Sequence, residues 1–140
     1  MGEELSCEEI MEFARDIRRN WGRNPFRIAE ICGIKVTEAD AKVPSGTTIC
    51  MPGYPTIISV FGAKTEAARR VLCAHELGHA LLHKEKTINR FNGTSDGVQS
   101  RCEYEANLFA VMLLFDENDF NRPVSDMDSW MLKAILDYNI

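Results

Sequence analysis

Several features that would place a chain in a familiar class are missing from this sequence. No run of about 18 apolar residues occurs, so no segment is expected to span a membrane as a helix. The first residues are acidic and lack the hydrophobic stretch of a secretory signal. The five cysteines are odd in number and include no C-x-x-C pair, which favours reduced thiols used for packing over ligands. We therefore expect a cytoplasmic protein that does not associate with a membrane.

The chain also lacks an excess of positive charge. It has 16 Lys and Arg against 21 Asp and Glu, for a net charge of −5. This balance argues against a protein that binds nucleic acid by general attraction to phosphate. With 140 residues, 45% of them hydrophobic, the chain is long enough to bury a sizeable core. We expect a single domain over residues 1–140.

Histidine is scarce, and its placement is informative, because all three histidines lie within nine residues. Residues 75–79 read His-Glu-Leu-Gly-His in an apolar pattern typical of a helix. Residues four apart lie on one helix face, so His75 and His79 can bind one metal ion. A catalytic zinc takes a third protein ligand and keeps a position open for water. Glu76 is then placed to accept a proton from that water as general base.

The periodicity of the chain predicts an α+β domain in the order α-α-β-β-β-α-α-α. The expected elements are a helix opened by a Ser6–Glu9 capping box, a helix begun by Asn24 and Pro25, strands near 34–37, 47–51 and 56–61 (the last two a hairpin-like pair), the motif helix over about 65–83 with Thr65 as its cap, a buried helix over 104–115, and a last helix capped by Ser125 or Asp126.

The polar stretch 84–98 between the motif helix and the buried helix is expected to be either a rim of the site or a plain surface loop. Ser100 and Glu103 after it have the spacing of a second capping box. The helix that follows is the natural source of a third ligand, because an ionised carboxylate at its buried start needs a partner.

With no other histidine available, the third ligand should be a carboxylate or a cysteine. Glu103 and Glu105 are about 200° apart around a helix, so we expect only one of them to face the ion. The capping role of Glu103 favours Glu105, with Glu103 as the alternative. Glu105 could also be simply an anion stabilised by the helix start. Cys73 is a weaker candidate because it lies nearly opposite His75, and Cys102 because a cysteine is uncommon beside this motif.

Three neighbours of these motifs have less definite roles. Asn107 is expected either to orient a ligand or to fill a packing gap. His83 drifts off the ligand face over two turns, so we expect it beside the ligands or at the surface and not as a ligand. Tyr104 could stabilise an oxyanion, but a structural role is favoured.

The sequence His-Glu-Leu-Gly-His-Ala-Leu-Leu-His at 75–83, followed by Glu-Ala-Asn-Leu-Phe-Ala at 105–110, resembles the ImmA/IrrE family of metallopeptidases. The resemblance covers about residues 25–115. It implies a compact zincin-like domain, with a short three-stranded sheet, an active-site helix and surrounding helices. The chain departs from the family at 113–116, where Leu-Leu-Phe-Asp stands in place of the usual Leu-Leu-Met-Pro at the expected substrate rim.

The resemblance also implies a site and a function. Zn²⁺ would be bound by His75, His79 and Glu105, with Glu76 as catalytic base. Members of this family occur typically in bacteria and mobile elements, and they cleave helix-turn-helix repressors. The expected function is therefore a zinc-dependent endopeptidase acting on a regulatory protein. Two alternatives are a non-hydrolytic zinc-containing regulator that sequesters a repressor or antitoxin-like partner, and a structural zinc domain closed by four protein ligands.

Overall fold

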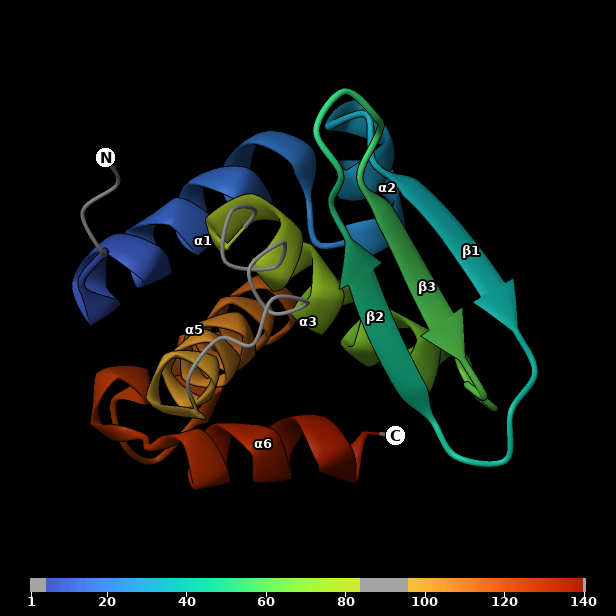
Figure 1. Cartoon of the computed structure of the whole chain (residues 1–140). Helices are drawn as coiled ribbons and strands as arrows, with labels where there is room; N and C mark the ends of the chain where they lie inside the picture. Colours follow the sequence, from blue (N-terminus) through green and yellow to red (C-terminus); the bar gives the residue numbers. More distant parts are fainter. Residues whose placement is uncertain (1–4, 84–95, 140) are drawn as a thin grey trace.

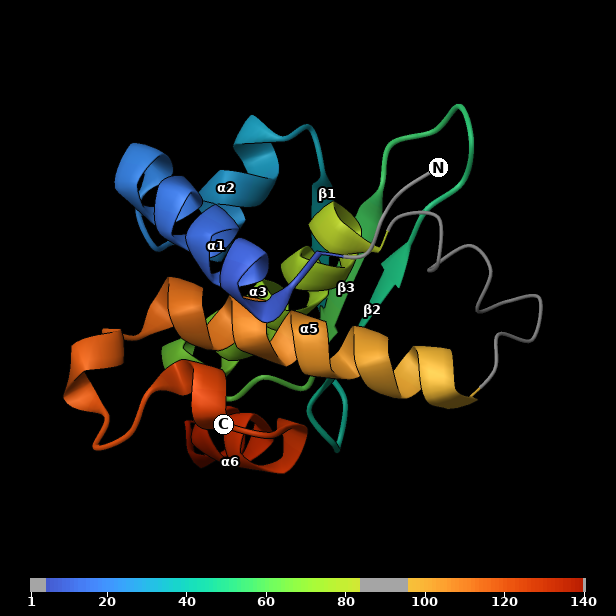
Figure 2. The same ribbon diagram turned by 90° about the vertical axis from the view of Figure 1, so that its left-hand side faces the viewer.

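Two helices that pack against each other form the centre of the molecule. In the computed structural model, which describes residues 5–83 and 96–139, these are α3 (Glu66–Leu82) and α5 (Asp96–Leu114). A sheet and α2 (Pro25–Ile31) pack on α3 (Figure 1). Helices α1 (Cys7–Trp21) and α6 (Ser129–Tyr138) pack on α5, above and below it in Figure 2. The architecture is the α+β arrangement expected from the sequence.

The sheet has three strands in the order β1-β3-β2. β1 (Lys35–Ala39) runs parallel to the central strand β3 (Ile57–Phe61), and β2 (Ser45–Ile49) runs antiparallel to it. The predicted hairpin-like pair is therefore confirmed. Because β3 is the middle strand, its alternate residues Ile58 and Val60 are buried against the helices. β2 lies at an edge of the sheet and packs directly on α3.

Local capping signals explain where three of the helices begin. The Ser6 side chain accepts from the backbone N–H of Glu9, and the Glu9 carboxylate accepts from the backbone N–H of Ser6, so the predicted capping box is present. Asn24 caps α2 and Thr65 caps α3, also as predicted. The start of α3 is thus set by its own sequence, and the His-Glu-Leu-Gly-His motif lies in the second half of the helix.

The predicted capping box at Ser100 and Glu103 is wrong. Helix α5 begins at Asp96, so both residues lie inside it and Ser100 cannot be its N-cap. Residues 96–98, the end of the stretch 84–98, therefore belong to α5. The rest of the predicted rim or loop, residues 84–95, lies outside the described part of the chain. The consequence for the site is that Glu103 is a side chain of the helix body rather than a cap.

The predicted cap of the last helix is also wrong. Ser125 and Asp126 belong to the short 3-10 helix η2 (Val124–Asp126), and α6 is capped by Asp128, whose carboxylate accepts from the backbone N–H of Met131. Helix α6 is anchored by Leu132 and Leu136, which are buried in the core.

The close approach of α3 and α5 depends on small residues. Gly78 of α3 faces Ala106 of α5, and a Cβ added to Gly78 would lie 3.1 Å from the Ala106 Cα. Residues 105–113 of α5 are all buried, which confirms the predicted buried helix. This contact brings the middle of α5 over the second half of α3. None of the described helices is long and apolar enough to cross a membrane.

Candidate metal centre

Helix α3 presents His75 and His79 on one face, as their spacing predicts. Their rings meet edge to face, with centroids 4.8 Å apart. His79 is almost wholly buried, whereas the His75 side chain keeps 18% of its surface exposed. One side of the pair is thus open to solvent.

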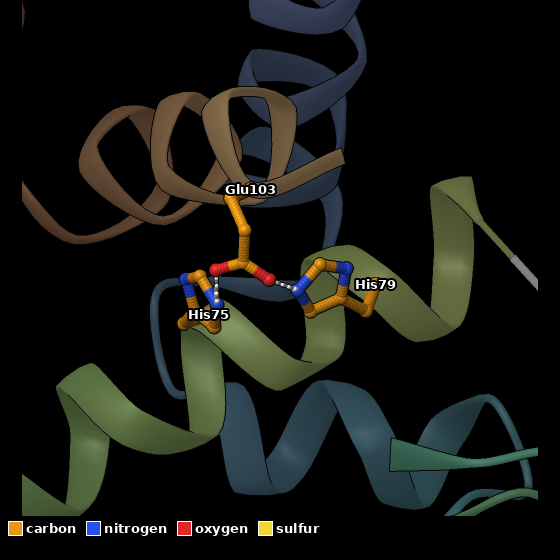
Figure 3. A group of neighbouring side chains, drawn as sticks. All are labelled: His75, His79 and Glu103. Atoms are coloured by element: carbon orange, nitrogen blue, oxygen red, sulfur yellow. Dashed lines mark hydrogen bonds and ion pairs between the residues drawn. The ribbon is translucent and has the colours of Figure 1, made fainter. Parts of the chain in front are cut away.

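Glu103 of α5 bridges the two histidines (Figure 3). Its Oε1 lies 2.8 Å from Nε2 of His79, and its Oε2 lies 3.1 Å from Nε2 of His75. One nitrogen from each ring and one carboxylate oxygen all lie within 4.8 Å of one another, close enough to hold one metal ion. Figure 3 shows the carboxylate reaching down from α5 between the two rings.

The donor set has the chemistry of a metal site. The carbonyl oxygen of Asn107 lies 2.8 Å from Nδ1 of His75. A carbonyl can only accept, so Nδ1 of His75 carries the hydrogen and its Nε2 presents a lone pair to the Glu103 carboxylate. Two acceptors that face each other repel unless a cation lies between them. Asn107 therefore orients His75, which was one of its two expected roles.

A proton can take the same place as a metal ion. Burial lowers the pKa of His75, but the hydrogen bond to Glu103 and the negative charges of Glu76 and Glu103 together outweigh burial and raise that pKa above its usual value. For His79, burial dominates and lowers the pKa. Burial opposes ionisation of Glu103, yet the two histidines hold the pKa of its carboxyl far below the usual range. The cluster thus keeps a carboxylate and a nearly buried imidazole in the forms that bind metal.

Glu76 lies beside this cluster and is held by the sheet. Its side chain is buried, and its Oε1 accepts from the Thr48 hydroxyl of β2 at 2.7 Å. Its Oε2 lies 4.0 Å from Nε2 of His75, next to the ligand atoms. A Cβ added to Gly46 of β2 would lie 2.9 Å from Cγ of Glu76. The strand therefore forms a wall against the base.

Thr48 and Gly46 were missed as site residues by the sequence reasoning, which placed Gly46 outside the strand expected near 47–51. A usable signal was present, because a glycine at a strand position often marks a close approach of another group. Nothing local in the sequence, however, indicates that this group is Glu76.

Glu105 lies elsewhere, and here the structure differs from the sequence expectation for the third ligand. Its Oε1 lies 2.7 Å from Nε2 of His83, and its Oε2 accepts from Nε of Arg101 at 2.8 Å. Burial would raise the pKa of the Glu105 carboxyl, but hydrogen bonds from His83 and Arg101 outweigh burial and lower it. The structure thus groups Glu103, and not Glu105, with His75 and His79. The physical reason is the earlier start of α5, which frees Glu103 from capping.

The remaining candidates do not join the cluster. Cys73 is fully buried, and burial raises the pKa of its thiol to about 12, so it stays protonated rather than forming the thiolate that metals bind. Cys102 is buried in α5 and is not part of the cluster. The hydroxyl of Tyr104 donates to Sγ of Cys7 at 3.5 Å, toward α1, which supports the structural role.

Comparison with known families agrees with the fold and the cluster. A model of the IrrE N-terminal-like domain, the Peptidase_M78 family, matches residues 29–136. The match spans more than half of the chain. The chain belongs to this family. The resemblance noted in the sequence is thereby confirmed. No curated protein and no solved structure gives a significant match.

Membership in the IrrE N-terminal-like family supports a function of metallopeptidase type. The matched residues contain the whole of α3 and α5, and therefore all three members of the His75–His79–Glu103 cluster. The family thus supports a metallopeptidase, and the cluster is compatible with the metal site that such an enzyme needs.

Proposed function

We propose that this chain is a zinc-dependent endopeptidase in which His75, His79 and Glu103 hold the metal and Glu76 is the general base. The observation that carries the proposal is the bridging of both histidine Nε2 atoms by one carboxylate, with a second carboxylate beside them. Two imidazoles and one carboxylate are the protein ligands of a common class of catalytic zinc sites. Zinc bound there would supply a Lewis acid that polarises the scissile carbonyl and makes a bound water more acidic.

The chain's own contribution to the chemistry is the handling of a proton by Glu76. Thr48 donates to Oε1 of this carboxylate and so fixes its orientation. Oε2 is left on the side of the ligand atoms, where it can accept a proton from the attacking water. The same carboxylate then passes that proton to the leaving amine. The strand β2 therefore positions the base.

A peptide substrate is supported by the same strand. Within the described residues β2 pairs only with β3, so its outer edge is available to an extended segment. Because Gly46 and Thr48 of β2 touch Glu76, a segment added along this strand would pass close to the base.

We propose a helix-turn-helix repressor as the protein that is cut. Support for this comes from the resemblance of the two motifs to ImmA/IrrE peptidases, together with membership in the IrrE N-terminal-like family. The same resemblance supports a bacterial, cytoplasmic setting, and a gene for such a repressor beside this one is the first candidate.

The test is incubation of the zinc-loaded protein with the neighbouring repressor, followed by mass spectrometry of the products. Wild type should give two fragments from one cleavage site. The Glu76→Gln variant should bind zinc normally and cleave at least about 10²-fold more slowly, because the proton acceptor is lost. Glu66→Gln, an exposed carboxylate in the first turn of the same helix, is the matched control and should cleave as wild type does.

Two results would contradict the proposal. Equal cleavage by wild type and Glu76→Gln would remove Glu76 from the mechanism. Relief of repression by both proteins without any fragment would favour the non-hydrolytic regulator that sequesters its partner.

A further inference from the structure

A hydrogen-bonded series of side chains, Arg101, Glu105 and His83, lies behind the metal centre. The proposed mechanism does not use this series. His83 and Glu105 are 2% and 4% exposed, so both are buried as completely as core residues. Nδ1 of His83 lies 3.1 Å from Nδ1 of His79, and Nε2 of His83 lies 2.7 Å from Glu105. Arg101 donates to the far oxygen of Glu105 at 2.8 Å. The series therefore runs from Arg101 to Nδ1 of His79, the nitrogen of this proposed ligand that faces away from Glu103.

The positions of the hydrogens in this series follow from which atoms can donate and which can accept. Arg101 donates to Glu105, and an ionised carboxylate only accepts, so Nε2 of His83 must carry a hydrogen. In neutral His83 the other nitrogen, Nδ1, then has a lone pair. The short contact between the two Nδ1 atoms is a hydrogen bond only if His79 donates it. Nε2 of His79 is consequently left with its lone pair toward Glu103, which is the tautomer that binds metal.

The two proposed ligand histidines differ in how this tautomer is set. The partner of His75 is the Asn107 carbonyl oxygen, which can only accept. The partner of His79 is another imidazole, which can accept or donate. A third group must therefore fix which of the two imidazoles donates, and buried Glu105, bonded to His83, is that group. This explains why a carboxylate that lies outside the ligand cluster is nevertheless buried and hydrogen-bonded on both oxygens.

We propose that His83, directed by Glu105, is a positioning residue that fixes the tautomer and ring orientation of His79. The inference deepens the proposed function, because it rests on His79 being a metal ligand. Groups that hydrogen-bond to a metal-bound histidine commonly change metal affinity or activity by about 10- to 100-fold when they are lost. We expect an effect of this size from His83, although it touches neither metal nor substrate.

The test measures zinc affinity by competition with a chromophoric chelator. His83→Phe keeps the ring but removes both nitrogens, and zinc should bind about 10- to 100-fold more weakly. His83→Gln can offer a carbonyl oxygen to Nδ1 of His79 and should recover part of the loss. As a single substitution, Glu105→Ala should weaken zinc binding. Added to His83→Phe it should cause little further loss, because both substitutions break the same hydrogen-bonded series.

Controls separate positioning from general damage. Urea unfolding of each metal-free variant reports whether the fold persists. Thr56→Val removes another buried polar group, one that donates to Cys50 away from the cluster, and should leave zinc affinity unchanged. If this control weakens zinc binding as much as His83→Phe does, the effect is not specific to the hydrogen-bonded series.

The outcomes distinguish the inference from the proposed function. A wild-type protein that binds no zinc would overturn both. Normal zinc binding in wild type, with the same affinity in His83→Phe, would overturn only the positioning role. A loss of zinc in Glu105→Ala as complete as in Glu103→Ala would mean that Glu105 is itself a ligand.

Discussion

At the scale of single residues, the proposed general base owes its position to a neighbour without a side chain. A Cβ added to Gly46 would lie 2.9 Å from Cγ and 3.2 Å from Oε2 of Glu76. The first distance is shorter than real Cβ contacts, so the Glu76 side chain would have to move. The carboxylate would then leave the place in which Thr48 holds it.

We predict that Gly46→Ala lowers kcat by about 10- to 100-fold, because a displacement on the order of 1 Å from productive geometry has effects of this size. Zinc affinity should not change, since the three atoms nearest the added methyl group all belong to Glu76 and none to a histidine. Steady-state kinetics and a zinc titration on the same sample measure both quantities. Ser45→Ala, an exposed substitution on the same strand, is the control and should keep full activity. Full activity in Gly46→Ala would show that β2 does not constrain the base.

The site residues differ in how far the sequence could predict them. His75, Glu76 and His79 share one helix, and helical geometry alone brings them to one place. The third proposed ligand comes from a second helix, where the choice between Glu103 and Glu105 depended on the start of α5. Such starts are uncertain by a few residues, and the start expected from the sequence favoured Glu105, whereas the structure places Glu103 beside His75 and His79. The role of His83 was open because burial cannot be read from its spacing.

At the scale of elements, the contact between α3 and α5 sets the geometry of the centre. Gly78 and Ala106 permit the close approach, and an added Cβ on Gly78 would also lie 3.2 Å from the Ala106 carbonyl oxygen. Backbone atoms cannot move aside as a flexible side chain can. A larger residue at this position must therefore push the helices apart, and Glu103 moves with α5.

We predict that Gly78→Val destabilises the metal-free protein by about 1–3 kcal/mol through overpacking, and that it weakens zinc binding as well. Urea unfolding and zinc titration measure the two effects. Arg70→Val places the same branched residue on an exposed part of α3 and should cost less than about 1 kcal/mol. Unchanged zinc affinity in a destabilised Gly78→Val would show that the helix spacing does not control the centre.

Elements were predictable from the sequence where their signals are local. The caps at Ser6, Asn24 and Thr65 involve residues two or three positions apart, and all three were found. The last helix was misjudged because several polar residues before it could cap, and the structure has Asp128 in this role, bonded to the backbone N–H of Met131. The parallel pairing of β1 with β3 joins distant segments, and no local pattern indicates it.

At the scale of the whole molecule, the proposed metal joins two parts of the chain. Its ligands come from α3, on which the sheet packs, and from α5, on which α1 and α6 pack. Anything that binds only the folded state stabilises it, by about 2.7 kcal/mol when its free concentration is 100 times Kd. Zinc should therefore act on the stability of the entire fold as well as on the chemistry.

Zinc titration of the metal-free protein tests the central claim most directly. We predict one zinc bound per chain in wild type and loss of this binding in both His79→Ala and Glu103→Ala, because each variant removes one of three ligands contributed by the chain. Glu105→Ala should still bind one zinc, with reduced affinity. A Glu103→Ala variant that binds zinc as tightly as wild type would contradict the account.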